Sequence, residues 1–99
     1  MYTQADLDNF ADAIIKNYTD WSNVNTPSLN NDAKVEFEYG KKYIRVVRSN
    51  HGQRSAHSFL EIATGNIWKA AGWKVPAKNK PRGNIANLTP NVTYWTGAV

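Results

Sequence analysis

The stretch that organises this chain runs from Arg54 to Ile85 and reads RSAHSFLEIATGNIWKAAGWKVPAKNKPRGNI. Its first part, residues 55–62, alternates its side chains with the two-residue period of a β-strand. The turn residues Thr64-Gly65-Asn66 then lead into a short strand at 67–70. Two prolines interrupt the remainder, because proline cannot donate a hydrogen bond to a sheet ladder. The stretch therefore predicts two antiparallel strands followed by an irregular loop.

The same period extends upstream over two further strands. Val35, Phe37 and Tyr39 alternate with charged residues, which predicts a half-buried strand that starts near residue 33. Gly40-Lys41 predicts a hairpin into a second strand at 43–48, and Asn50-His51-Gly52 predicts the next turn. Together these segments predict an antiparallel meander over about residues 33–71. Strict alternation in its third strand predicts one face with Ala56, Ser58, Leu60 and Ile62 and the other with His57, Phe59 and Glu61.

The N-terminal residues predict an amphipathic helix. Leu7, Phe10, Ile14 and Tyr18 recur at the three-and-four spacing of one helix face, which predicts a helix over about residues 4–19. Thr3 and Asp6 resemble a capping box at its start. We interpret the apolar face as the side that covers the sheet. Residues 20–32, rich in Asn, Ser and Thr, are expected to form a linker.

The C-terminal part, residues 72–99, is predicted to be a basic loop and tail. Val92 to Thr96 reads VTYWT, whose β-branched and aromatic residues favour a fifth strand. The sequence as a whole therefore predicts a single α+β domain over residues 1–99. Its N-terminal helix would be followed by a curved antiparallel sheet of four or five short strands. This element order also fits closure into a small Sm-like or SH3-like barrel, a comparison of architecture that carries no function.

Composition excludes several classes of protein. Hydrophobic residues at 41% and charged residues at 20% are typical of a globular domain. The chain has no cysteine, so disulfides and thiolate metal sites are excluded. Neither a signal peptide nor an apolar run of the ~18 residues needed to span a membrane is found. We expect a cytoplasmic protein without a cofactor, a metal or a membrane partner.

Charge is distributed unevenly along the chain. Residues 1–38 hold seven acidic and two basic side chains, whereas residues 39–99 hold ten basic side chains against Glu61 alone. Cations near flat rings are the pattern expected for phosphates and unpaired bases. The candidate nucleic-acid-binding residues are Lys69, Trp73, Lys74, Lys78, Lys80 and Arg82. The alternative interpretation is that Trp73 belongs to the core and that the lysines only keep the loop in solvent.

Two further groups of residues have side chains suited to binding or catalysis. Arg45, Arg48 and Arg54 would form a basic sheet face if Arg45 lay beside His57, but cross-strand pairing with glutamates is the simpler interpretation. The residue types for acid–base or nucleophilic catalysis are His51, Ser55, His57, Ser58 and Glu61. Their spacing matches no catalytic or zinc motif, so no catalytic residue is predicted and we expect a protein that is not an enzyme.

Part of the chain resembles a known group of proteins. The segment TGNIWKAAGWKVPAK at 64–78, with Arg82-Gly83-Asn84-Ile85, is similar to a motif in small uncharacterised proteins of tailed bacteriophages, including marine ones. The similarity covers about residues 45–85 and departs from the motif at Asn66, where Asp is common. The resemblance implies a viral or marine metagenomic origin and no activity.

These patterns lead to two hypotheses about function. The first is a phage-type accessory protein, not an enzyme, that binds single-stranded DNA or RNA, or another polyanion, through the basic loop. The second is a protein-interaction module or homo-oligomer with no role in nucleic-acid binding. The salt dependence of binding distinguishes the two hypotheses, because a complex dominated by phosphate contacts loses affinity steeply as the salt concentration rises.

Overall fold

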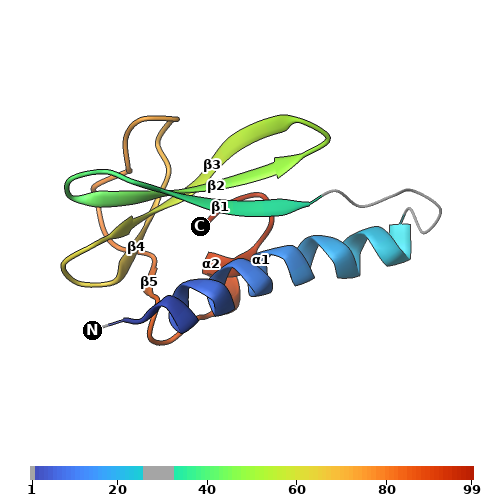
Figure 1. Cartoon of the computed structure of the whole chain (residues 1–99), viewed down its shortest axis with the longest axis horizontal. Coiled ribbons are helices and arrows are strands. Elements are labelled where there is room, and N and C mark those ends of the chain that lie inside the picture. The colour runs from blue at the N-terminus through green and yellow to red at the C-terminus, as the bar shows by residue number, and fades with distance from the viewer. Residues whose placement is uncertain (1, 26–32) are drawn as a thin grey trace.

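The structure is a computed structural model that describes residues 2–25 and 33–99. The helices are α1 (Gln4–Asn25) and α2 (Pro90–Thr93), and the strands are β1 (Lys34–Tyr39), β2 (Tyr43–Asn50), β3 (Gln53–Glu61), β4 (Asn66–Lys69) and β5 (Gly83–Asn84). All neighbouring strands are antiparallel, in the order β1-β2-β3-β4-β5. The predicted α+β fold, a helix followed by an antiparallel meander, is confirmed (Figure 1).

Helix α1 begins as predicted and ends later than predicted. Thr3 N–H donates to the Asp6 carboxylate at 2.8 Å, and Asp6 N–H lies 3.3 Å from the Thr3 hydroxyl, which is the reciprocal pairing of a capping box. Residues 20–25, expected in the linker, are helical. The side chain of Ser22 is buried and the Trp21 ring lies 5.9 Å from that of Tyr18, so packing outweighs weak helix propensity. The rest of the expected linker, 26–32, lies outside the described residues.

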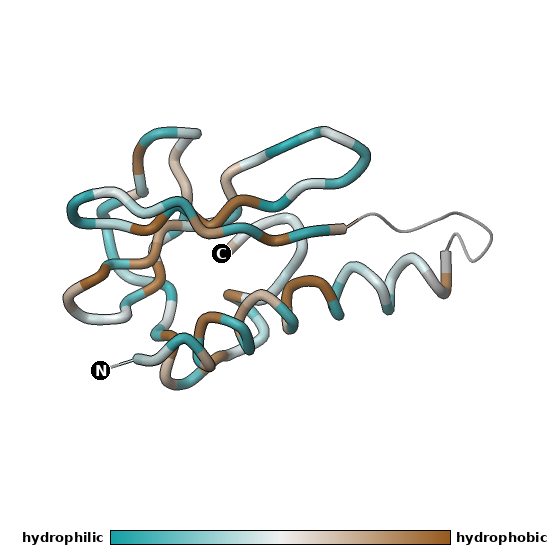
Figure 2. Tube along the Cα trace, viewed as in Figure 1, coloured by the Kyte–Doolittle hydropathy of each residue, from teal (hydrophilic) through white to brown (hydrophobic). Residues whose placement is uncertain are grey.

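The core lies between α1 and one face of the sheet. From the helix, Leu7, Phe10 and Ile14 are buried, as the three-and-four spacing predicts. They belong to one cluster with residues of the sheet and the C-terminal part of the chain, namely Ile44, Val46, Leu60, Ile67, Ile85, Val92 and Ala98. Figure 2 shows hydrophobic segments on the facing sides of α1 and the central strands, and hydrophilic segments at the tips of the β1–β2 and β2–β3 hairpins.

A β-bulge changes the predicted faces of β3. Val46 pairs with Ser58 whereas Val47 pairs with Ala56, so His57 is an extra residue in β3. The bulge puts Ala56 and Ser58 on opposite faces of the sheet. The prediction that they share a face is therefore wrong, as is the shared face of His57 and Glu61. His57 packs edge-to-face on Phe10 of α1, with ring centroids 5.9 Å apart.

The C-terminal part differs from the prediction. Instead of a strand at 92–96, residues 90–93 form α2, which begins with a proline, the residue favoured at the first helical position. Val92 is fully buried, and a Cβ on Gly83 would lie 3.0 Å from its Cγ1. The fifth strand is instead β5, and the absence of a side chain at Gly83 lets Val92 pack closely against it.

The sheet is open in the described part of the chain. Strands β1 and β5 are its two edges, so the closure into a barrel that the element order allowed does not occur. Within residues 2–25 and 33–99, no helix combines the length and hydropathy that a membrane span requires.

Candidate functional site

The loop between β4 and β5 follows the outer edge of β4. Ala70 forms a β-bridge with Pro76, and Ala77 N–H donates to the Lys69 carbonyl at 2.7 Å. Farther along the loop, Arg82 N–H donates to the Ile67 carbonyl at 2.7 Å. These bonds hold the basic loop against the sheet at both ends, which limits the positions its side chains reach.

Trp73 anchors the same loop on the face of the sheet opposite α1. The Arg45 guanidinium lies over the Trp73 ring at 4.2 Å from the centroid, and that of Arg54 lies at 5.5 Å. In addition, Arg45 Nη1 donates to the Trp73 carbonyl at 3.0 Å. Trp73 is 38% exposed, so its ring is shared between this packing and solvent. Two cations on one ring fix the loop over β2 and β3.

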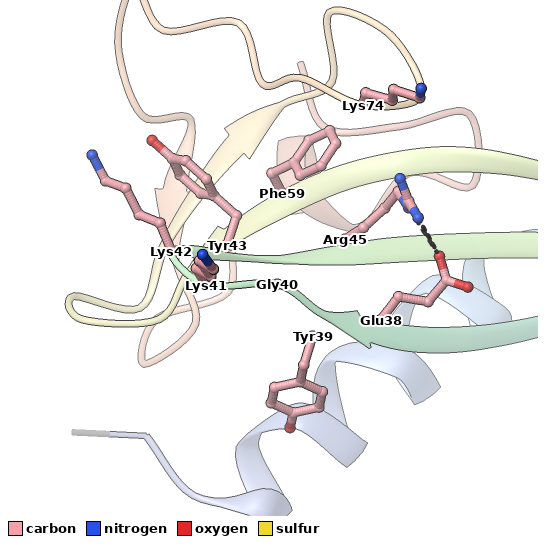
Figure 3. A pocket seen from close by; sticks show the side chains of 9 residues that line it. All are labelled: Glu38, Tyr39, Gly40, Lys41, Lys42, Tyr43, Arg45, Phe59 and Lys74. Atoms are coloured by element: carbon pink, nitrogen blue, oxygen red, sulfur yellow. Dashed lines mark hydrogen bonds and ion pairs between the residues drawn. The ribbon is translucent and has the colours of Figure 1, made fainter.

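A basic groove opens on this face beside the β1–β2 hairpin. We use the name for the depression of about 260 Å³ lined by Glu38, Tyr39, Gly40, Lys41, Lys42, Tyr43, Arg45, Phe59 and Lys74. Figure 3 shows Lys42, Tyr43, Arg45 and Phe59 on one side of the strands, whereas Tyr39 projects to the opposite side, toward α1. The groove therefore combines two aromatic rings with four cations and one carboxylate.

The carboxylate of the groove is already paired. Glu38 accepts from Arg45 Nε at 2.9 Å and from Arg54 Nη2 at 2.8 Å, which confirms the predicted cross-strand pairing of these arginines. The hydrogen bonds from Arg54 and then Arg45 lower the pKa of Glu38 below its usual value. Two guanidiniums compensate a single carboxylate, so this cluster keeps an excess positive charge.

The lysines of the groove have no acidic partner among the described residues. Lys41 and Lys42 follow Gly40 in the hairpin loop, and Lys74 approaches from the β4–β5 loop. A hairpin tip and a loop far apart in sequence thus bring their cations to one opening. An opening of this kind concentrates positive potential where an anion enters.

Tyr43 is the aromatic centre of the groove. Its ring meets Phe59 in a T-shaped arrangement with centroids 6.3 Å apart. The ammonium of Lys42 lies 5.5 Å from the Tyr43 ring centroid and that of Lys78 lies 5.8 Å from it. Phe59 is buried and Tyr43 is half-buried, so Phe59 is the support and Tyr43 the accessible ring.

Half of the predicted binding residues lie at this groove. Lys74 lines it, Lys78 reaches Tyr43, and Trp73 covers Arg45. The other half lie elsewhere, and they are Lys69, Lys80 and Arg82. Lys69 pairs with Ser58 and so belongs to the face that carries α1.

Lys80 and Arg82 lie on the far part of the loop. Lys80 is exposed, and Arg82 Nη2 donates to the Asn79 side chain at 3.3 Å. The Arg82 carbonyl accepts a hydrogen bond from Asn91 Nδ2, in α2, at 2.9 Å. These contacts tie Arg82 to the C-terminal part of the chain rather than to the groove.

Sequence reasoning missed the hairpin side of the groove. Lys41, Lys42, Tyr43 and Phe59 were not predicted as binding residues. The adjacent lysines Lys41 and Lys42, followed by Tyr43, are a sequence pattern that could have indicated a binding surface. The pattern alone does not place Phe59 there, because Phe59 comes within reach of the β2 side chains only through the register that pairs it with Arg45.

The residue types considered for catalysis do not form one site. His57 Nε2 lies 2.7 Å from the Tyr94 carbonyl and therefore donates to it, and Nδ1 lies 2.8 Å from the Ser58 hydroxyl. Burial lowers the pKa of His57 to about 4. Glu61 instead accepts from Trp68 Nε1 at 3.2 Å on the other face. The described residues contain no cluster of three or more side chains suited to hold a metal.

Comparison with known proteins defines the family and no more. Neither the curated proteins nor the solved structures gave a match. One family model matches residues 1–97, which is nearly the whole chain, and it describes a family of unknown function. This chain therefore belongs to DUF7717, a family of unknown function.

Proposed function

We propose that this protein binds single-stranded DNA or RNA through the basic groove. The observation that carries the proposal is the combination of Lys41, Lys42 and Lys74 around the accessible ring of Tyr43. Single-strand binding proteins use cations for the phosphates and aromatic rings on which bases stack. Both components meet here within one depression of about 260 Å³.

The size of the groove suits one base at a time. Pockets that enclose a drug-sized ligand usually measure roughly 300–1,000 Å³, so this depression is smaller than a site for a whole dinucleotide. In the proposed complex one base stacks on Tyr43 while its phosphates contact Lys41 and Lys42. The strand continues toward Lys74 and Lys78 on the β4–β5 loop, where Trp73 offers a second ring. Contacts of this kind tolerate many sequences.

The proposed role is that of an accessory protein and not of an enzyme. The bacteriophage-like motif at 64–78 supports a viral origin, in which case the protein acts in the host cytoplasm. The second hypothesis, a protein-interaction module, is an outcome of the experiment below. An interface that rests on aromatic packing is much less sensitive to salt than one that rests on phosphates.

The test is a fluorescence-anisotropy titration of labelled single-stranded DNA and RNA at two salt concentrations. Contacts from Lys41, Lys42, Lys74 and Lys78 predict a slope of log affinity against log salt of about −3, at about −0.7 for each phosphate. The double variant Lys41→Gln/Lys42→Gln is expected to bind more weakly and to reduce the slope by about 1.4.

A matched variant distinguishes the contribution of the groove to affinity from the contribution of the total charge. Lys69→Gln/Lys80→Gln removes the same charge outside the groove, and we expect a smaller loss of affinity. Equal losses in the two double variants would mean that binding follows net charge and not the groove. Absence of binding at low salt would contradict the proposal and would favour the protein-interaction hypothesis.

A further inference from the structure

A second cavity lies at the other end of β2, between the β2–β3 hairpin and the C-terminal part of the chain. Its volume is about 370 Å³, and Arg48, Asn50, Ser55 and Trp95 are among its lining residues. Arg48 pairs with Val35 and Ser55 in the sheet register, which puts it on the face opposite Arg45. The cavity is therefore separate from the basic groove.

The wall of this cavity is held in place by several contacts. The Trp95 ring packs against Tyr18 of α1 with centroids 4.7 Å apart, and Trp95 N–H donates to the Asn17 side chain at 2.9 Å. The Arg48 guanidinium lies over the Trp95 ring at 5.5 Å from the centroid. Asn50 Nδ2 donates to the Tyr18 hydroxyl at 2.8 Å. These bonds orient both Arg48 and Asn50 before any ligand binds.

Among the described residues, two polar atoms of this wall are buried without a hydrogen-bond partner. They are Arg48 Nε, a donor, and Asn50 Oδ1, an acceptor. Within residues 2–25 and 33–99, no carboxylate pairs with Arg48, in contrast to Arg45 and Arg54, which share Glu38. Burial lowers the pKa of Arg48 below its usual value, and no acidic side chain among the described residues offsets the desolvation of this cation. His57, on the same face, adds no charge at neutral pH, since its pKa is about 4.

We propose that this cavity binds a small molecule in which an oxyanion, phosphate or carboxylate, lies next to a hydrogen-bond donor. The oxyanion accepts from Arg48 Nε and supplies the missing counter-charge. The neighbouring donor binds Asn50 Oδ1. Arg48 and Asn50 are two residues apart on one strand, so their side chains lie on one face, and both line this cavity. The cavity volume lies within the usual range for small-molecule sites.

NMR titration of the full chain tests the proposal with two probes. Hydrogen phosphate and glycolate each carry an oxyanion next to a hydroxyl donor, so they distinguish phosphate from carboxylate ligands. We expect one of them to shift the Arg48 Nε–H and Trp95 indole signals saturably. Arg48→Gln should weaken this binding at least tenfold, whereas Lys74→Gln, which removes a cation of the basic groove, should leave it unchanged.

A second variant supplies the counter-charge from within the chain. Asn50→Asp replaces the Nδ2 donor with a carboxylate oxygen, which can accept from the Tyr18 hydroxyl, and it places a carboxylate on the same face as Arg48. We expect it to abolish anion binding and to raise the melting temperature, which shows that it folds. Saturable shifts that persist in Arg48→Gln would overturn the proposal, as would the absence of saturable shifts with both probes in the unmodified protein.

Discussion

Arg45 and Arg48 lie three residues apart on β2, on opposite faces of the sheet and in opposite electrostatic situations. Arg45 forms an ion pair with Glu38 at 2.8 Å and packs on Trp73. Arg48 packs on Trp95 and has no acidic partner among the described residues. Arg45 is paired, so the cations without an acidic partner on its face, among the described residues, are the neighbouring lysines of the basic groove. On the opposite face, Arg48 is itself the cation without an acidic partner. The same residue type on one strand thus lies in two opposite electrostatic environments, and we propose a different kind of anion site for each.

The largest expected effect is a loss of folding stability at low pH. It arises only on the face of the sheet that packs against α1. The pKa of His57 is depressed to about 4 from 6.5, so the unfolded chain binds this proton more readily than the folded chain. Its contribution to stability is complete above pH 6.5 and is lost as pH falls toward 4, with a total of about 3 kcal/mol. Urea unfolding measured from pH 7 to pH 4 checks this decrease.

The matched variants for that experiment are the two histidines. His57→Gln should remove this part of the pH dependence, whereas His51→Gln, at the exposed β2–β3 turn, should retain it. An identical pH dependence in the unmodified protein and in His57→Gln would contradict the assignment to His57.

The next largest effect concerns the outer face. Lys41→Glu/Lys42→Glu reverses two charges of the basic groove, so repulsion replaces attraction for phosphates. We expect affinity for a single-stranded oligonucleotide to fall on the order of 100-fold at low salt. Lys69→Glu/Lys80→Glu is the matched charge reversal outside the groove, and it should lower the affinity for the oligonucleotide clearly less. A similar loss in both would remove the distinction between the groove and the rest of the basic surface.

A smaller effect is expected from the aromatic centre of the groove. Tyr43→Leu keeps an apolar side chain against Phe59 and removes the stacking ring. Loss of one stacked base is expected to weaken oligonucleotide binding by about 1–3 kcal/mol, with little change in the salt slope. The measurement is the same anisotropy titration. An unchanged affinity would show that Tyr43 is a packing residue and that the cations act alone.

The smallest expected effect compares the two arginines directly. Arg45→Gln should lower the free energy of unfolding by about 1 kcal/mol, because both its ion pair with Glu38 and its stacking on Trp73 are partly exposed. Arg48→Gln should not lower it, since removal of an unpaired, partly buried cation offsets the lost stacking of about 0.5–1 kcal/mol. Urea unfolding of both variants checks this. A larger loss for Arg48→Gln than for Arg45→Gln would mean that the chain itself supplies the missing partner.

The sequence predicts those parts of the fold that depend on short-range patterns. The spacing of Leu7, Phe10 and Ile14 identifies the buried face of α1, and the alternation around Phe37 identifies β1. The strand predicted at 92–96 is wrong because a proline start and the burial of Val92 against Gly83 outweigh β-propensity. The bulge at His57 was also missed, since strict alternation leaves no place for an extra residue.

The candidate site was predicted only where it is continuous in the sequence. Trp73, Lys74 and Lys78 stand out because the loop that holds them is basic and aromatic. The hairpin lysines and Tyr43 join them only through the antiparallel register of β1, β2 and β3. The cavity beside Arg48 depends on the C-terminal part of the chain, which folds back to put Trp95 under the guanidinium. No local pattern encodes that contact.

The most direct test of the central claim is an NMR footprint of a single-stranded oligonucleotide on the unmodified protein at low salt. We expect the backbone signals of Lys41, Lys42 and Tyr43 to shift most, together with those of Phe59 and Lys74. Signals of Lys69, Lys80 and Arg82 should move less. A footprint centred on Lys80 and Arg82, or the absence of any shift, would contradict the claim that the basic groove is a nucleic-acid surface.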